Sequence, residues 1–419
     1  MTIDVTTLPN GLRVATDTMD TVETVSLGVW VDVGARHEPE AINGISHLLE
    51  HMAFKGTERR SAQDIATEIE DVGGHLNAYT SRENTAYYAK VLKDDAPLAL
   101  DIIADIIQHS VFDPEELKRE QAVVVQEINQ AFDIPDDIIF DYFQAVAYPE
   151  QALGRPVLGT ADVVRSVTRD TIATYLRDSY HASRMVLAAA GRIEHARMVD
   201  MAADAFSNLP GQSPLADDPA RYRGGDFRES RDLEQVHLVL GFDGVPYDDP
   251  DYYASSVLSG LLGGGMSSRL FQEIREKRGL AYTIYSFASS YQDGGLFAVY
   301  AGAGDEEVAE LVPVLCDEIV KVTQDVADDE VRRSRAQIKA SILMGLESTS
   351  SRCEQLARQL LVFGRPISPE EAVAKLEAVH AGSVTSLARR ILSSAPSLAV
   401  LGPHERVESL DGIRSRLVL

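Results

Sequence analysis

The chain has 419 residues, 45% of them hydrophobic, and a formal net charge of −26 at pH 7. This length favours two domains over one, and the negative charge repels nucleic acid and anionic lipid surfaces. Apolar stretches fall short of the ~20 residues that a membrane helix needs, so we expect no membrane partner. Residues 1–8 have neither the basic start nor the apolar core of a signal peptide, so we expect a cytoplasmic protein.

The first informative element is a helix that follows a predicted strand at residues 25–33 and carries the run His47-Leu48-Leu49-Glu50-His51. His47 and His51 lie one turn apart and share a face of the helix. Two neutral imidazoles on one face can bind one Zn²⁺, while Glu50 reaches the water that the metal polarises. A solvated surface helix is the alternative. Apolar neighbours favour an anchored helix, on which histidines have partners or bind metal: Ile45, Leu48, Leu49, Met52 and Phe54.

A helix at residues 61–72 and paired strands at 75–80 and 85–92 follow. The first of these strands has two interpretations. Its edge could pair with an extended peptide through backbone hydrogen bonds, which would make binding tolerant of the peptide's sequence. It could also be an internal strand with both edges paired, which periodicity does not exclude.

A long helix is predicted over residues 113–128, where an Asp cap and Pro114 precede acidic residues that suit the positive end of the helix dipole. Glu120 and Glu127 are seven residues apart, so they share one face beside an apolar stripe. A carboxylate in such a place needs a partner or a metal. Because a catalytic zinc usually keeps three protein ligands, this helix is the best source of the third, although Glu120 could be an ordinary exposed carboxylate.

The polar segment that begins at residue 208 predicts a linker over 208–230 between domains at 1–207 and 231–419. The second half repeats the element order of the first, without metal ligands where the first has its histidines. We therefore expect an α+β fold of two homologous domains from a duplication, each a mostly antiparallel sheet with helices packed on one face. The repeated elements are a strand at 236–242, helices at 252–262 and 267–277, strands at 281–289 and 295–301, and helices at 305–325 and 329–346.

These motifs together resemble the pitrilysin/insulinase family of zinc metallopeptidases. His47-x-x-Glu50-His51, then Glu120 and, 76 positions after His51, Glu127 are similar to its zinc site. Residues 77–88 resemble its substrate strand, and Arg275 with Tyr282 resemble its Arg/Tyr pair. Within the family, residues 47–57 are most similar to the beta subunit of mitochondrial processing peptidase and its bacterial relatives.

The resemblance implies a zinc-dependent endopeptidase that hydrolyses peptides or unfolded segments in a closed dimeric chamber. One Zn²⁺ per chain would be held by His47, His51 and Glu127, with Glu50 as general base toward the zinc-bound water. Glu120 would orient a histidine ligand from outside the ligand set. The remaining assignments are substrate binding by Asn77, Ala78 and Tyr79, and stabilisation of the developing oxyanion by Arg275 and Tyr282.

The expected partners follow from the same resemblance and from the charge. One chain has two domains where the family's chamber has two domain pairs, so we expect a homodimer in which Arg275 and Tyr282 serve the zinc site of the other subunit. Acidic side chains lining the chamber would concentrate basic peptides, but the charge could also serve solubility alone. Two rivals are a catalytic subunit that needs a different partner chain and a noncatalytic assembly subunit like the respiratory-complex core proteins.

Overall fold

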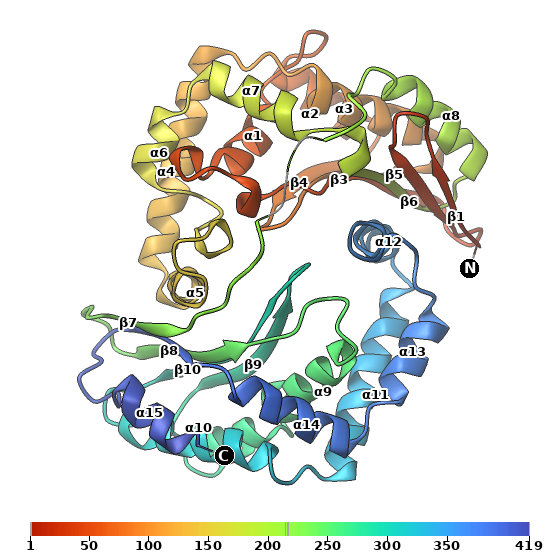
Figure 1. Ribbon diagram of the computed structural model, residues 1–419. Coiled ribbons are helices and arrows are strands. Elements are labelled where there is room, and N and C mark those ends of the chain that lie inside the picture. The colour runs from red at the N-terminus through yellow and green to blue at the C-terminus, as the bar shows by residue number, and fades with distance from the viewer. Residues whose placement is uncertain (1, 214, 216–217, 419) are drawn as a thin grey trace. The chain divides into compact units, whose positions relative to one another are not determined.

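The computed structural model describes residues 2–213, 215 and 218–418, which belong to two compact units, each with its own sheet and core (Figure 1). Neither unit is a continuous stretch of chain. The first comprises Met1–Gln130, Arg155–Asp218 and Met344–Ile367. The second comprises Ala131–Gly154, Pro219–Leu343 and Ser368–Leu419.

The sheet of the first unit is mostly antiparallel. In the described part of the chain its strands lie in the order β1 (Thr2–Thr7), β2 (Arg13–Thr18), β6 (Met185–Gly191), β3 (Thr24–Val31), β5 (Thr85–Leu92) and β4 (His75–Thr80). Neighbours are antiparallel except for β2 and β6, which run parallel. The central strand β3 is buried along nearly its whole length, as expected for a strand covered on both faces.

Most helices of the first unit lie on one face of this sheet. The main core contains Val25, Leu27 and Val29 of β3 together with Leu48 and Met52 of the helix that carries the histidines. Alternate residues of a strand point to opposite faces, so these β3 side chains share one face. The helices on this side are α1 (Ile45–Ala53), α2 (Ala62–Asp71), α3 (Ala96–Gln108), α4 (Pro114–Asp133), α6 (Ala161–Ser166), α7 (Arg169–Ser179) and α8 (His195–Ala205).

The opposite face of the first sheet is covered by α12 (Thr349–Phe363), which comes from the second half of the sequence (Figure 1). Cys353, Leu356 and Leu360 of α12 pack against Trp30 and against the alternate small residues of β6. Val186, Ala188 and Ala190 form that small-residue surface. The helix therefore replaces solvent on a sheet face that would otherwise be exposed and apolar.

The second unit repeats this architecture. Its described strands lie in the order β7 (Gly225–Glu229), β11 (Ser397–Leu401), β8 (Val236–Asp243), β10 (Gly295–Ala303) and β9 (Thr283–Ser290). β7 and β11 run parallel and the other neighbours antiparallel, which reproduces the pattern from β2 to β4 in the first sheet. The predicted α+β fold with a duplicated, mostly antiparallel sheet is confirmed.

One face of the second sheet carries most of its helices, and the other is covered by α5 (Pro135–Ala147) from the first half of the sequence (Figure 1). Ile139 and Phe143 of α5 pack against Val239, Ala298 and other residues of this face. The helices on or around the first face are α9 (Tyr252–Gly263), α10 (Val308–Val322), α11 (Asp328–Gly345), α13 (Pro369–Glu377), α14 (Ala381–Leu392) and α15 (Leu410–Arg416).

α5 and α12 occupy equivalent places in the two repeats, so the halves of the sequence exchange one helix each. Helices were expected on one face of each sheet, but the exchanged helix also covers the other face. The compact units consequently do not coincide with the ranges 1–207 and 231–419. Within the expected linker 208–230, residues 225–229 form β7, and residues 214, 216 and 217 lie outside the described residues.

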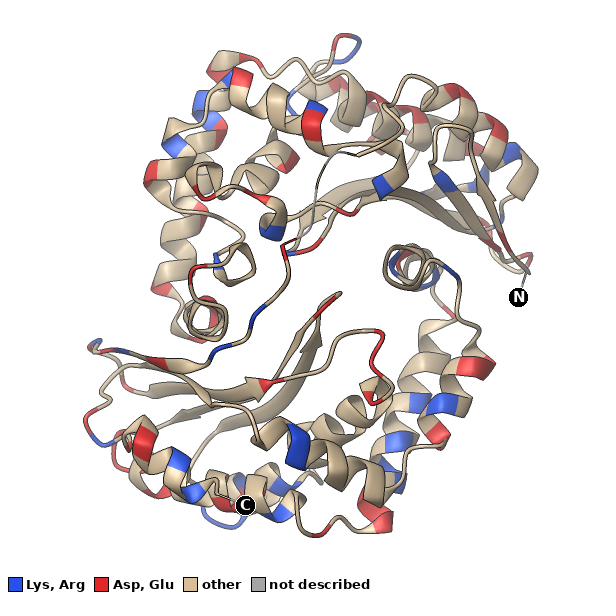
Figure 2. Ribbon diagram, viewed as in Figure 1, with Lys and Arg blue, Asp and Glu red and all other residues tan. Residues whose placement is uncertain are grey.

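Many Lys, Arg, Asp and Glu residues lie in the helices, where acidic and basic positions often occur close together (Figure 2). Examples are the pairs between Arg119 and Glu116 on α4 and between Arg333 and Asp329 on α11. Cys316 and Cys353 are buried and not bonded to each other, as expected for small core residues. Among the described residues, no helix is both long enough and apolar enough to cross a membrane.

Candidate metal centre

The helix α1 is fixed in the core of the first unit with its polar side turned toward α4. Ile45, Leu48, Leu49 and Met52 are buried, whereas His47, Glu50 and His51 keep partial exposure. This division follows from the helical period, which separates the apolar stripe from the polar positions.

The start of α1 is held by a buried carboxylate that the sequence pattern did not reveal. Glu38, 2% exposed, accepts hydrogen bonds from the backbone N–H groups of Gly44 and Ser46 at 2.7 and 2.8 Å. A carboxylate there satisfies N–H groups that have no partner within the helix and interacts favourably with the helix dipole. Burial raises the pKa of Glu38, and the hydrogen bonds from Gly44 and Ser46 oppose that shift. Glu38 therefore sets where α1 begins.

The helix α4 presents Glu120 and Glu127 to α1. Leu117, Val124 and Val125 are buried, and the Gln121 side chain donates to the carbonyl oxygens of Val164 and Val167 at 2.9 and 2.8 Å. These contacts fix the rotation of α4 about its axis. Glu120 and Glu127, two turns apart, are thereby both directed at the histidine helix.

The structure brings His47, His51 and Glu127 together. Oε2 of Glu127 lies 3.5 Å from Nε2 of His47 and 3.6 Å from Nε2 of His51. One ligand atom from each of the three residues lies within 4.8 Å of the others. A tetrahedral zinc ion with ligands at about 2.0–2.1 Å separates neighbouring ligand atoms by roughly 3.3 Å. The donor atoms are of the type that such an ion binds, and the two distances from Glu127 to the histidines are close to this spacing.

The protonation state of His47 suits this role. Burial, reinforced by the neighbouring His51, lowers the pKa of His47 to about 4, so its imidazole is neutral at neutral pH and keeps a lone pair for a metal. Its Nδ1 is buried without a hydrogen-bond partner in the part of the chain that the structure describes. By contrast, Nδ1 of His51 lies 3.0 Å from Oε2 of Glu120, which directs Nε2 of His51 toward Glu127.

Glu50 lies beside these residues and has a defined partner. The Thr80 hydroxyl, at the end of β4, donates to Oε2 of Glu50 at 2.6 Å. Burial raises the pKa of Glu50 above the ordinary value, while the Thr80 hydrogen bond and His51 act in the opposite direction. No local pattern in the sequence relates Thr80 to Glu50, because their contact arises only when β4 packs on α1.

The predicted substrate residues Asn77, Ala78 and Tyr79 lie on β4, the last strand in the order of the first sheet. The backbone N–H of Ala78 donates to the side-chain oxygen of Asn77 at 2.9 Å, so this N–H is directed away from β5. Tyr79 accepts a hydrogen bond from the Trp30 indole at 3.2 Å and donates to Glu354 of α12 at 3.4 Å. Burial, followed by the charge of Glu354, raises the pKa of Tyr79 to about 12.

Arg275 and Tyr282 belong to the second compact unit and are neighbours there. The guanidinium carbon of Arg275 lies 4.7 Å from the ring centroid of Tyr282 and 4.7 Å from that of Phe271, within the range of cation–π attraction. Tyr282 is 75% exposed. Arg275 lies on a π-helical segment, Phe271–Glu276, where a regular helix over 267–277 was expected.

Comparison with known proteins assigns the family. A family model described as "Insulinase (Peptidase family M16)" matches residues 13–161, and one described as "Peptidase M16 inactive domain" matches residues 166–338. The chain is 40% identical over 403 residues to an "Uncharacterized zinc protease" of Rickettsia felis, a match that covers 96% of this chain and 98% of the relative. The chain belongs to the insulinase family of peptidases, M16. The resemblance inferred from the sequence is confirmed.

Further M16 relatives have similar names. An "Uncharacterized zinc protease" of Bacillus subtilis is 38% identical, with coverage of 96% of this chain and 99% of the relative. The "Probable mitochondrial-processing peptidase subunit beta" of Arabidopsis thaliana is also 38% identical, over 98% of this chain and 80% of its own length. The two M16 models divide the chain so that the one described as inactive matches the half without the histidine helix.

Solved structures share the fold of this M16 chain. A protease from Helicobacter pylori matches with a TM-score of 0.88 and 22% identity, over 96% of this chain and 99% of that one. A chain of Complex III2 from Candida albicans matches with a TM-score of 0.89 and 21% identity over the full length of both. Because one neighbour is named a protease and the other is a chain of Complex III2, the fold alone does not distinguish catalysis from assembly.

Proposed function

We propose that the chain is a zinc-dependent endopeptidase that hydrolyses peptides or unfolded segments. The convergence of His47, His51 and Glu127, with Glu50 beside them, is the observation that carries this proposal. Membership of the M16 peptidase family supports peptide hydrolysis as the class of reaction, and zinc proteases among the relatives support Zn²⁺ as the metal.

In the proposed mechanism, His47, His51 and Glu127 hold one Zn²⁺ per chain. When bound, the metal supplies a Lewis acid that polarises the substrate carbonyl and makes water more acidic. Glu50 accepts a proton from the attacking water and passes it to the leaving amine. The Thr80 hydroxyl donates a hydrogen bond to Oε2 of Glu50, which leaves Oε1 for the water. The raised pKa of Glu50 suits a group that both accepts and donates a proton.

Substrate selection is assigned to the edge of β4. An extended peptide would add to β4 through backbone hydrogen bonds, with the outward N–H of Ala78 as one donor after the Asn77 side chain moves aside. Backbone pairing of this kind tolerates many sequences, which suits a peptidase of unfolded segments. The net charge of −26 supports a preference for basic peptides.

Arg275 and Tyr282 are proposed to stabilise the developing oxyanion and to bind the substrate backbone. Their mutual contact orders both side chains, and the exposure of Tyr282 leaves its hydroxyl available. We further propose a cytoplasmic homodimer with a closed chamber, in which this pair acts on the zinc site of the other subunit. The alternatives are a catalytic subunit of a heterodimer and a noncatalytic assembly subunit, and the complete donor set at α1 and α4 favours catalysis.

The test uses the purified single chain. Gel filtration with light scattering reports its oligomeric state, and an internally quenched peptide reports cleavage with and without a chelator. We expect activity that chelation abolishes and zinc restores, and Glu50→Gln should bind zinc without cleaving. Zinc-independent cleavage, or an inactive zinc-loaded chain, would contradict the proposal.

The trans arrangement requires a separate experiment. Glu50→Gln and Tyr282→Phe proteins, each inactive alone, are mixed under conditions where subunits exchange. Recovery of activity in the mixture is expected, because a mixed dimer contains one intact pairing. If subunits exchange and no activity returns, the trans assignment of Tyr282 is wrong.

A further inference from the structure

We infer that Lys55 is a positioning residue of the metal centre: its ammonium group holds the Glu120 carboxylate in the orientation that fixes the ring of His51. The inference rests on the proposed function only in taking His51 as a zinc ligand. Lys55 lies four residues after His51, just beyond the end of α1.

The first step is the contact pattern of Glu120. Oε1 of Glu120 lies 2.7 Å from Nζ of Lys55, and Oε2 lies 3.0 Å from Nδ1 of His51. Each carboxylate oxygen thus has its own partner. The Glu120 side chain is 7% exposed, so water has little access to replace a lost partner. Without the ammonium, Oε1 would be buried without that charge-assisted bond, and the carboxylate could rotate away from His51.

The second step is the orientation of His51. With Nδ1 bonded to Glu120, the ring places Nε2 at 3.6 Å from Oε2 of Glu127. A hydrogen bond to the second nitrogen of a ligating imidazole fixes its tautomer and orientation, and its loss commonly weakens metal affinity. Since Nδ1 of His47 has no hydrogen-bond partner within the described residues, His51 is the imidazole that the chain itself orients.

The third step is the backbone that carries Lys55. Its N–H bonds the carbonyl of Met52 at 3.2 Å, which continues the last turn of α1, and Gly56 then turns the chain at φ +115°, a conformation that favours glycine. Next, the Thr57 hydroxyl donates at 2.8 Å to the Asp105 carboxylate, which is fully buried on α3. Lys55 is therefore held between two anchored points of the backbone.

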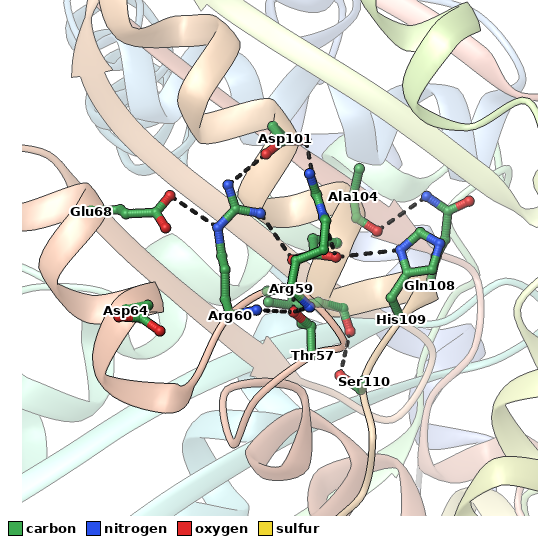
Figure 3. Close-up of polar contacts among 12 residues, drawn as sticks. Thr57, Arg59, Arg60, Asp64, Glu68, Asp101, Ala104, Gln108, His109 and Ser110 are labelled. Atoms are coloured by element: carbon green, nitrogen blue, oxygen red, sulfur yellow. Dashed lines mark hydrogen bonds and ion pairs between the residues drawn. The ribbon is translucent and has the colours of Figure 1, made fainter.

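Two arginines add to the contact of residues 55–60 with α3 (Figure 3). Nε of Arg59 and Nη1 of Arg60 donate to Asp105 at 3.1 and 2.9 Å, and Arg60 also donates to Asp101 at 2.6 Å. The segment from Lys55 to Arg60 is thus tied to α3. A long, flexible lysine loses less freedom on forming an ion pair when its backbone is already fixed, which favours a defined geometry for the contact with Glu120.

An incidental ion pair is the alternative, because the Lys55 side chain is 29% exposed. An incidental pair of this kind would contribute little to folding stability and would not affect metal affinity. Zinc affinity therefore separates the two roles, and it can be measured without a substrate.

The experiment measures zinc dissociation constants of metal-free proteins by competition with a chromophoric chelator, alongside thermal melts. The variants are Lys55→Met, Lys55→Gln, Lys55→Arg, Glu120→Gln and the double variant K55M/E120Q. The matched control is Lys93→Met, which removes another lysine–glutamate pair, with Glu23, at 2.7 Å.

We expect Lys55→Met and Lys55→Gln to weaken zinc binding by about tenfold or more, as loss of an outer hydrogen-bond partner typically does. Lys55→Arg should retain most of the affinity, Lys93→Met should be unchanged, and K55M should have no further effect in the Glu120→Gln background. If Lys55→Met and Lys55→Gln fold and bind zinc with unchanged affinity, the inference about Lys55 is wrong, although the proposed function is not affected. The same holds if K55M weakens zinc binding equally in the wild-type and Glu120→Gln backgrounds. A wild-type chain that binds no zinc would overturn the proposed function as well.

Discussion

The Thr80 hydroxyl donates to Oε2 of Glu50 at 2.6 Å, which joins the end of β4 to the helix that carries both histidines. The strand assigned to substrate and the proposed general base are thereby held in a fixed relation. We expect Thr80→Val, which keeps the shape and removes the donor, to lower kcat by about tenfold, a fraction of what a positioned general base contributes. Zinc content should not change.

Measurement of kcat and zinc stoichiometry on the same preparation checks this prediction. Thr85 is a suitable control, because its hydroxyl donates to the carbonyl of Val33 instead. A Thr80→Val protein with wild-type kcat would mean that Glu50 is oriented without Thr80.

Removal of the metal should lower stability as well as activity. A ligand that binds only the folded state stabilises it by about 4 kcal/mol at a free concentration 1,000 times its Kd. We therefore expect chelation to lower the Tm, and Glu127→Gln, which loses one of the converging donors, to show little further change on chelation. Differential scanning calorimetry with and without zinc measures this difference. An equal zinc-dependent shift in wild type and Glu127→Gln would remove Glu127 from the ligand set.

Ala78→Pro tests the role of the β4 edge. Proline at position 78 removes the N–H that is directed away from β5 and leaves the pairing of β4 with β5 intact. An edge strand tolerates proline at such a position, where the N–H does not bond to the neighbouring strand. An incoming peptide would lose one backbone hydrogen bond of about 1 kcal/mol, so we expect KM to rise about fivefold with kcat nearly unchanged. A normal KM for several peptides would place the substrate elsewhere.

The buried Asp105 should be a large contributor to stability. Asp105→Ala would leave Arg60, whose side chain is 10% exposed, without one of its carboxylate partners and Thr57 without its acceptor. Breaking a buried ion pair from one side costs about 3 kcal/mol. Urea denaturation should show this loss, whereas Asp101→Ala, at a side chain that is 45% exposed, should cost less than about 1 kcal/mol.

The exchanged helix α12 gives a prediction about packing. Leu356 of α12 is 3% exposed and lies in the cluster with Trp30 and β6, so Leu356→Ala should destabilise the protein by about 3 kcal/mol. Hydrogen exchange should increase in Met185–Gly191 of β6. Gln355→Ala, at an exposed neighbouring position, serves as the control. Protection of β6 that is unchanged in Leu356→Ala would contradict the packing role.

Local periodicity accounts for what the sequence predicted at the site. His47 and His51 are brought to one face by one helical turn, and Glu120 and Glu127 by two, so each pair could be predicted before its partner was known. Glu38 and Thr80 could not be found in this way. Thr80 reaches Glu50 through tertiary packing between residues that are 30 positions apart. Glu38 lies only six positions before Gly44, but the segment between them is neither an α-helix nor a strand, and no helical or strand period predicts its conformation.

The fold shows the same distinction between local and long-range information. Hydrophobic patterns predicted some of the strands and helices of both repeats, among them β3, β4 and β5 in the first and β8, β9 and β10 in the second, and their common order predicted the duplication. The pattern of α5 or α12 shows which face of the helix is apolar, but it does not specify which sheet that face covers. The exchange between the repeats therefore appeared only in the structure, where Phe143 packs with the second sheet and Cys353 with the first.

The exchange of α5 and α12 has a consequence for biosynthesis. When the ribosome has completed the first sheet at β6, one side of that sheet still lacks α12, which is made more than a hundred residues later. Until then the alanine-rich surface of β6 faces water or a chaperone. Expression of the first half alone would for the same reason yield an aggregation-prone fragment that still contains every proposed zinc ligand.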